Sequence, residues 1–459
     1  MKKNKIKLTN FGKLFFIVIA VIIALIIYSI TGNVNDKYNI KNKYSELNSK
    51  ESTNNSSNTN NTNNNLKDKN YFVYSEYITD TEESDHDVIN TTFASGLPLD
   101  TYKSLITKKS NYIKSNGKYE KFTYDFENKL HYTEIEKMLL NLNNSNIVDL
   151  EVIGKTVDGR NMYGVEIGKG TDVIFIDANI HAAEIASTVM LMRFMGEIVN
   201  DYENNNSEIV KALNNVKLAI IPSINPDGYE IYNFGLDALN NKNLWWYQVK
   251  DTYNFKDMKS NANGIDINRN FPTQNAGLYF KGKSLLKNVA MNKTTKNGVF
   301  FGGKNLGSEP ETQATMYFML KHYQNTIYYL NMHSQGRVIY AGKPNLANEF
   351  NNITQNYAKR VANINGYRVH GLSSEEVGEG NDGTATDFMA ELANGFKFST
   401  KTLKLSTDKH INNSSTLKYS FPVVTIETLN KYTDDVSVFK NEYYNYGIRK
   451  VFYDVLKNK

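Results

Sequence analysis

The longest hydrophobic run in the chain lies near its N-terminus. Residues Leu14 to Ile30 are almost wholly apolar and carry no charge, and with their neighbours they approach the roughly 20 residues that cross a bilayer as a helix. Four lysines precede this run between Met1 and Lys7, so we expect a membrane anchor whose N-terminus stays in the cytoplasm. A cleaved signal peptide is the alternative, but the run is long for one and no clear cleavage site follows it.

A polar stretch separates this run from the rest of the chain. From Gly32 to about Asn70 the residues are mostly Asn, Ser, Thr and Lys, including the run Asn54 to Asn65. Such a composition cannot bury a core, so we expect a flexible tether. The following residues, Tyr71 to about Tyr119, are aromatic enough to be ordered, and their role stays unassigned.

From about Phe122 the pattern becomes that of a globular domain. Apolar positions at helical spacing predict a helix over Tyr132–Leu142, and a second helical stretch runs from about Ile185 to Asn200. Short β-rich runs alternate with such stretches; they cover residues 149–153, 162–167, 173–178, 216–221, 326–332 and 423–426. Because several of these strands end in polar residues, the pattern predicts an α/β fold with a site along one edge of a sheet.

Composition narrows the chemistry that such a site can use. The chain has 459 residues and no cysteine, which excludes disulfides, thiolate nucleophiles and cysteine-bound zinc. Any metal must therefore be held by His, Asp or Glu. The net charge is only +5 and no basic stripe is present, so we expect no nucleic-acid partner.

Histidine and glutamate residues at strand ends form a candidate metal site. His181 and Glu184 follow one apolar strand and stand three residues apart, so both can face one ion. His333 ends another strand, and these three ligands would leave a fourth position for water, as catalytic zinc requires. A His-x-x-Glu pair alone could equally arise by chance, in which case the histidine would be structural.

Three more polar residues extend the candidate site. Glu427 ends the last apolar strand, where a carboxylate is costly to bury unless it is paired or used, and near a metal it could act as general base. Asn268 and Arg269 together suit two-point binding of a carboxylate. Each of these residues alone is more often structural. The order in which they follow one another along the chain favours a shared site.

This ordered set of motifs resembles the zinc carboxypeptidase family: H-x-x-E, N-P-D-G, G-x-D-x-N-R-N, a strand ending in H-S and a strand ending in T-I-E. Four segments look most like a bacterial branch that includes γ-D-glutamyl-diaminopimelate peptidases, which trim peptidoglycan stem peptides. They are SINPDGYE (Ser223–Glu230), KSNANGIDINRNFP (Lys259–Pro272), GSEPETQAT (Gly307–Thr315) and MHSQGRVIY (Met332–Tyr340).

The resemblance implies an α/β/α sandwich of three layers around a mixed, mostly eight-stranded sheet. It also implies one zinc ion per chain, held by His181, Glu184 and His333. Glu427 would be the catalytic base, and Asn268 and Arg269 would hold the terminal carboxylate of the substrate.

Three positions depart from the family pattern. Ala183 replaces an arginine that the digestive members carry, and Asn263 replaces an arginine that many bacterial relatives use to stabilise an oxyanion. Either Asn263 donates a weaker hydrogen bond, a lysine such as Lys250 or Lys259 substitutes, or the rate is reduced.

The third departure lies in GNDGTATDF (Gly380–Phe388), which resembles the substrate-pocket loop of the family. The resemblance puts Thr386 near the pocket floor and Glu379 where relatives often carry a mobile tyrosine. Glu379 could pair with a substrate ammonium group; a solvated loop residue is the equal alternative.

The sequence therefore predicts a membrane-anchored, extracytoplasmic zinc metallopeptidase acting on an amide bond near a free carboxylate, with peptidoglycan stem peptides as the expected substrate. A carboxypeptidase for ordinary peptides and a zinc-retaining binding protein of weak activity are the alternatives. The expected parts are a cytoplasmic tail (1–10), an anchor (11–31), a linker (32–70), an extension (71–121) and a catalytic domain (122–459).

Overall fold

The structure is a computed structural model that describes a large part of the chain. The described residues are 105, 108–251, 254–273, 301–303, 306–342, 348–370, 383–394, 396–398, 405–407 and 421–458. They belong to one compact unit, Asp68–Lys459. The predicted anchor and linker, most of the extension, and Glu379 lie outside the described residues. Among the helices that are described, none combines the length and apolar character needed to cross a membrane.

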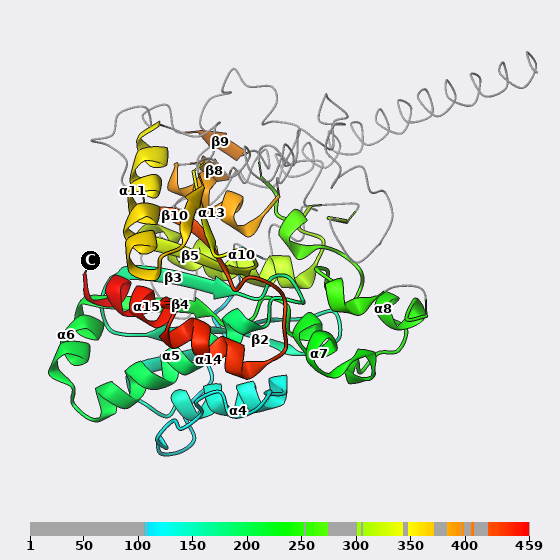
Figure 1. The fold of residues 1–459 in the computed structure, drawn as a ribbon, viewed down its shortest axis with the longest axis horizontal. Helices are drawn as coiled ribbons and strands as arrows, with labels where there is room; N and C mark the ends of the chain where they lie inside the picture. The colour runs from blue at the N-terminus through cyan, green and yellow to red at the C-terminus, as the bar shows by residue number, and fades with distance from the viewer. Residues whose placement is uncertain are drawn as a thin grey trace, which may run out of the picture. The chain divides into compact units, whose positions relative to one another are not determined.

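An eight-stranded sheet forms the centre of this unit, in the order β1-β2-β4-β3-β5-β10-β6-β7 (Figure 1). Neighbouring strands β4, β3, β5 and β10 are parallel, whereas β1, β2 and β4 pair antiparallel to one another and β6 pairs antiparallel to β10. The strand bounds are β1 Val148–Lys155, β2 Asn161–Ile167, β3 Asp172–Ala178, β4 Val216–Ile221, β5 Thr326–Ser334, β6 Val338–Ala341, β7 Arg368–His370 and β10 Val423–Thr428. A separate antiparallel pair consists of β8 Phe396–Phe398 and β9 Leu405–Thr407.

Helices cover both faces of the sheet, as Figure 1 shows for α5 and α14 on one side and α13 on the other. The bounds are α4 Tyr132–Leu142, α5 Ala186–Glu203, α6 Ser207–Asn215, α7 Pro226–Phe234, α8 Trp245–Gln248, α10 Pro310–His322, α11 Asn348–Asn365, α13 Ala385–Ala393, α14 Val436–Tyr444 and α15 Ile448–Lys457. Short 3-10 turns occupy η2 Leu236–Ala238, η3 Phe255–Asp257, η4 Ile267–Arg269 and η6 Tyr323–Asn325.

Alternate side chains of the central strands pack into two different hydrophobic cores, one on each face of the sheet. On β3, Ile174 and Ile176 pack into the core that contains α4, α5, α14 and α15, while Phe175 packs into the core of α10 and α13. Strands covered on both faces are apolar at nearly every position, which is why β3 and β4 were recognisable from sequence as continuous hydrophobic runs. The predicted mixed eight-stranded sheet is confirmed.

The end of the predicted extension packs on the edge of this sheet. Tyr112 forms an antiparallel bridge with Glu151 of β1, and the amide of Ile113 donates to the carbonyl of Leu150 at 2.8 Å. This contact pairs part of the outer strand, which reduces its exposure as an open edge. The domain boundaries given above stay predictions.

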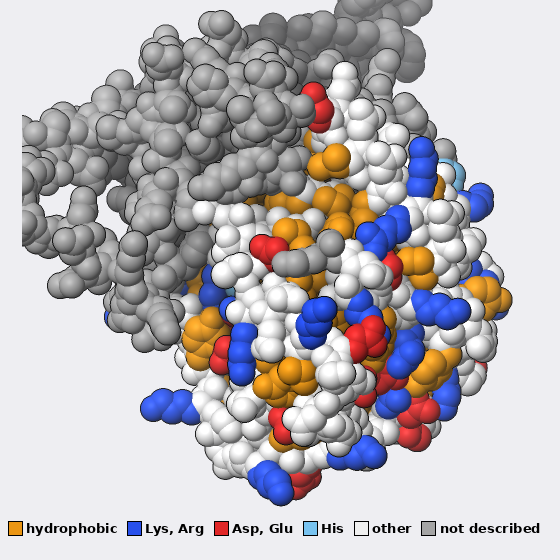
Figure 2. Space-filling model, turned by 90° about the vertical axis from the view of Figure 1, so that its left-hand side faces the viewer, with side chains coloured by type: hydrophobic (Ala, Val, Ile, Leu, Met, Phe, Trp, Pro, Cys, Tyr) orange, Lys and Arg blue, Asp and Glu red, His pale blue; other side chains and the backbone are white. Residues whose placement is uncertain are grey.

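Charged side chains of both signs are interspersed over the described surface seen in Figure 2, with apolar side chains between them. This mixed distribution is typical of a soluble domain surface.

Candidate metal centre

The turn after β3 places two of the predicted ligands side by side. Asn179 adopts a left-handed backbone conformation (φ 54°), and its side-chain amide donates to the carbonyl of His181 at 2.9 Å. The amide of Glu184 then donates to the same carbonyl at 3.1 Å. This tight turn brings the His181 ring and the Glu184 carboxylate together, with Nδ1 and Oε1 2.8 Å apart.

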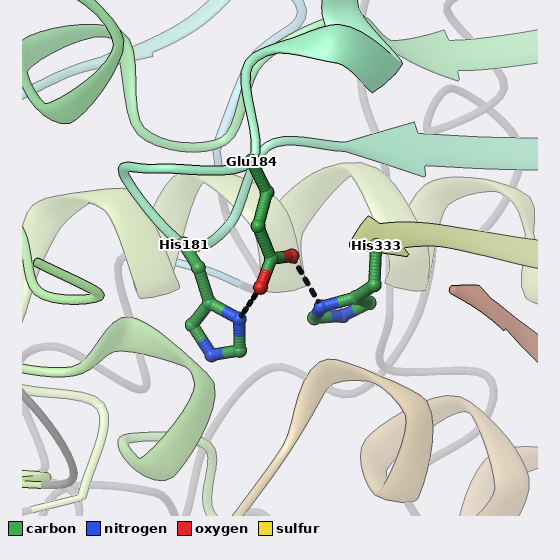
Figure 3. Close-up of side chains that lie close together, drawn as sticks. All are labelled: His181, Glu184 and His333. Atoms are coloured by element: carbon green, nitrogen blue, oxygen red, sulfur yellow. Dashed lines mark hydrogen bonds and ion pairs between the residues drawn. The ribbon is translucent and has the colours of Figure 1, made fainter. Parts of the chain in front are cut away.

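The third predicted ligand comes from β5, the parallel neighbour of β3. Because Ala178 pairs with Met332, the two strands end at the same edge, and His333 follows directly. Its Nδ1 lies 2.8 Å from Oε2 of Glu184, so the carboxylate sits between the two rings (Figure 3). The ligand atoms of the three residues all lie within 4.8 Å of one another.

These residues fit a metal ion better than a purely structural role. All three are buried, with at most 4% of each exposed. Nε2 of His333 and Oε2 of Glu427 are also buried and make no hydrogen bond within the described residues. Buried polar atoms are normally satisfied, so such a group of converging nitrogen and oxygen donors matches the ligand set that zinc prefers.

A carboxylate that sequence reasoning did not single out supports His181 from outside. Oδ1 of Asp266 lies 3.5 Å from Nε2 of His181, and Asp266 is fully buried. Burial raises the pKa of Asp266, but His181 and Arg269 outweigh this and hold it at about 2. A carboxylate behind a metal-binding imidazole typically fixes the orientation of the ring. Its place in the G-x-D-x-N-R-N motif was the available signal.

Glu427 stands next to the metal ligands because of strand register. On β10 it pairs directly with His333 of the parallel strand β5. Burial raises the pKa of Glu427 to about 7, although His333 and Lys259 lower it. A carboxyl group with a pKa near neutrality can both take up and release a proton, which is the property a general base and acid needs.

A cavity of about 310 Å³ opens beside these residues. It is lined by six of the predicted site residues: His181, His333, Glu427, Asn268, Arg269 and Thr386. Glu184 lies between the two histidines and is not among the lining residues, and Glu379 lies outside the described residues. The structure thus gathers seven of the eight predicted site residues in one place, whereas the roles proposed for them remain to be tested.

Asn268 and Arg269 are presented by the short turn η4. Asp266 caps this turn by accepting the amide of Asn268 at 3.0 Å. The side-chain oxygen of Asn268 accepts the amide of Ala385 at 3.0 Å, which leaves its side-chain nitrogen as the donor toward a ligand. Nη1 of Arg269 donates to the carbonyl of Asn268 at 2.6 Å, so the two residues hold each other in place.

The departures from the family pattern have clear positions. Ala183 is buried, and Asn263 is not among the residues that line the cavity. Lys250 is exposed and stacks over the ring of Tyr247 at 4.5 Å. Lys259 lines the cavity, with Nζ 3.7 Å from Oε1 of Glu184, so of the two lysines it is the one that lies at the candidate site.

Comparison with known families agrees with this geometry. A model of the family described as zinc carboxypeptidase matches residues 135–432, well over half of the chain. The chain belongs to the zinc carboxypeptidase family. Zinc is therefore the metal of the site, and His181, Glu184 and His333 are the candidate ligands in this family member.

Curated relatives of this zinc carboxypeptidase family member include both animal and bacterial enzymes. Carboxypeptidase O of Bos taurus is 27% identical over 55% of this chain and 64% of its own length. Gamma-D-glutamyl-L-diamino acid endopeptidase 1 of Lysinibacillus sphaericus is 32% identical over 42% of this chain and 47% of its own length. The chain thus spans less than two thirds of either relative.

The fold is also found in solved structures. Bovine thrombin-activatable fibrinolysis inhibitor, in complex with tick carboxypeptidase inhibitor, aligns with a TM-score of 0.50 and 18% identity. The alignment covers 73% of this chain and 99% of that chain. At this identity the likeness establishes the carboxypeptidase-like fold.

Proposed function

We propose that this chain is a zinc-dependent peptidase that hydrolyses an amide bond near a free carboxylate in peptidoglycan stem peptides. The observation that supports it most is the single cavity shared by two candidate zinc ligands, Glu427 and the Asn268–Arg269 pair. The bacterial relative named as a gamma-D-glutamyl-L-diamino acid endopeptidase supports the substrate class.

The chain's own residues divide the work of such a reaction. Arg269 and the side-chain nitrogen of Asn268 bind the substrate carboxylate and so fix the position of the scissile bond. Glu427 takes a proton from the attacking water and passes it to the leaving nitrogen. Zinc, when bound by its three ligands, supplies a Lewis acid that polarises the carbonyl and makes water more acidic.

We further propose that the domain works outside the cytoplasmic membrane, tethered to it. The apolar run Leu14 to Ile30 and the Asn-rich stretch after it support this arrangement. A flexible tether would let an anchored peptidase reach the cell wall.

The direct test is mass spectrometry of purified stem peptides after incubation with the zinc-loaded full chain. We expect release of a fragment that contains a diamino acid, and no release by Glu427→Gln, which keeps the shape of the side chain but cannot take up the proton. Zinc content is measured in both proteins, because the control is valid only if Glu427→Gln still binds one zinc ion.

A carboxypeptidase acting on ordinary peptides is the second candidate, since the Asn268–Arg269 pair suits any C-terminal carboxylate and animal carboxypeptidases are among the relatives. Cleavage of ordinary peptides without cleavage of stem peptides would favour it. Failure on both, with zinc bound, would support the zinc-retaining binding protein.

A further inference from the structure

A chain of hydrogen bonds lies at the side of the cavity formed by α13, β5 and β10. The hydroxyl of Thr386 donates to Oδ1 of Asn331 at 3.1 Å, and it lies 3.0 Å from the hydroxyl oxygen of Thr425. Behind them, Nδ2 of Asn331 donates to Oδ1 of Asp177, whose Oδ2 accepts the hydroxyl of Tyr329 at 2.7 Å. Asn331, Asp177 and Tyr329 are fully buried, whereas Thr386 and Thr425 line the cavity.

The donor and the acceptor of each of these hydrogen bonds can be assigned by starting from the buried end of the network. The amide nitrogen of Asn331 can only donate, and the Asp177 oxygen receives it, so Oδ1 of Asn331 faces Thr386 as an acceptor. The single hydroxyl proton of Thr386 is committed to that oxygen. Thr425 must therefore donate its own proton to Thr386 across the 3.0 Å contact.

Both threonine oxygens consequently face the cavity with lone pairs and no spare proton. Each hydroxyl oxygen has two acceptor positions, of which Thr386 uses one and Thr425 uses none in the bonds described above. We refer to Thr386 and Thr425 as the acceptor pair. A substrate group that can only accept hydrogen bonds would find no donor on these two oxygens and would face their lone pairs, which is unfavourable.

Two buried carboxyl groups on this side of the cavity favour the same kind of ligand. Asp387 follows Thr386 on α13 and also lines the cavity, and Asp177 adds a second buried carboxyl group behind it. Of the lysine and arginine side chains that line the cavity, Lys259 lies instead against Glu184, at the metal end, and Arg269 is held against the carbonyl of Asn268.

We propose that the acceptor pair, held in this direction by Asn331 and Asp177, selects a substrate residue whose side chain ends in a hydrogen-bond donor. An ammonium or primary amide end is accepted over a carboxylate or methyl end. The inference rests on the proposed peptidase function of this cavity, and it narrows the substrate to a residue such as a diamino acid. Asn331 and Asp177 are positioning residues in this scheme.

Binding to the full-length, zinc-loaded Glu427→Gln protein tests the proposal without requiring turnover. Calorimetry is carried out with acetylated dipeptides that differ only in the C-terminal residue: ornithine, glutamine, glutamate or norleucine. These side chains are similar in length and differ in their terminal group. We expect ornithine and glutamine to bind at least about fivefold more tightly than norleucine, the effect of one net hydrogen bond, and glutamate to bind most weakly.

A second variant separates the acceptor pair from general packing. In the same background Thr386→Val keeps the side-chain shape but removes the oxygen, so the preference for glutamine over norleucine should disappear while norleucine binding is retained. Thr315→Val makes the same change on α10, where the hydroxyl donates to the carbonyl of Glu311, and should leave the order of affinities unchanged.

The outcomes of this experiment are distinct. Equal affinities for glutamine and norleucine, or tightest binding of glutamate, would overturn the inference even if peptides are cleaved. The expected order of affinities, combined with no cleavage by the wild-type chain, would support the inference and count against the proposed function. Absence of binding by all four peptides would overturn both.

Discussion

Lys259 is the candidate for charge stabilisation in this cavity that the geometry favours. Asn263, where the family resemblance leads us to expect an arginine, does not line the cavity. Lys259 does line it, and three quarters of its side-chain surface is covered (24% exposed). A partly buried ammonium group facing the reacting carbonyl can stabilise negative charge that develops on its oxygen.

We expect Lys259→Met to lower kcat about 10²-fold with little change in KM, because the lost stabilisation acts only in the transition state. Lys250→Met is the matched control and should retain full activity, since Lys250 is exposed and does not line the cavity. Steady-state kinetics on a cleaved peptide checks this, with zinc content measured for each protein. Unchanged kcat in Lys259→Met would remove the lysine from the mechanism.

The first turn of helix α10 contains a buried glutamate that lies close to other acidic side chains. Glu311 lies in its first turn, fully buried, and accepts the amide of Val157 at 3.0 Å and the side chain of Asn261 at 3.2 Å. Burial raises the pKa of Glu311 to about 8, and the nearby Asp227 and Glu309 add to the rise. The folded state therefore holds a proton on this carboxyl that the unfolded chain releases at lower pH.

The stability of the fold should fall as pH rises between about 4.5 and about 8, since the unfolded state ionises Glu311 first. Below this window the carboxyl is protonated in both states, and above it the contribution is lost. Glu311→Gln should flatten the slope by up to about 1.4 kcal/mol per pH unit. Urea unfolding from pH 5 to pH 9 measures it, with the exposed Glu120→Gln as a control expected to keep the wild-type slope.

The sequence predicted the central elements well, because a strand covered on both faces and a helix with one apolar face leave clear patterns. Strands β3, β4 and β10 and helix α4 lie within one or two residues of their predicted bounds. The short strands β6 and β7, at one side of the sheet, were missed because they have only four and three residues. Such short segments carry too little periodicity to distinguish them from loops.

Site residues with a clear local sequence signal were likewise predictable, whereas residues without one were not. His181, His333 and Glu427 stand at strand ends within recognisable motifs, so their convergence was predictable. Asn331 was not, although it stands two residues before His333 on the same face of β5, since its role depends on contact with Thr386 from a distant helix. Long-range partners of this kind become visible only when the strands and α13 are placed together.

Across the folded chain, zinc should act as a cross-link between the turn after β3 and the end of β5. Anything that binds only the folded state stabilises it, by about 2.7 kcal/mol when the free ligand is at 100 times its Kd. We therefore expect chelation to lower the Tm and added zinc to restore it. Thermal unfolding followed by circular dichroism checks this.

Two variants identify the source of that shift. His333→Ala removes a ligand and should abolish the rise in Tm on adding zinc. Glu427→Gln should retain it, because Glu427 is not one of the three converging ligands. A zinc-dependent Tm that survives in His333→Ala would place the metal elsewhere.

The register of β3, β5 and β10 also bears on how the site is acquired during folding. Glu184 and the backbone of Ser334 are in contact although 150 residues separate them, and Glu427 belongs to a strand that is made later still. Contacts between residues so far apart in the sequence form slowly, after the intervening chain has collapsed. A growing chain thus has no complete metal-binding site until its central strands have paired, so metal capture marks the end of folding rather than its start.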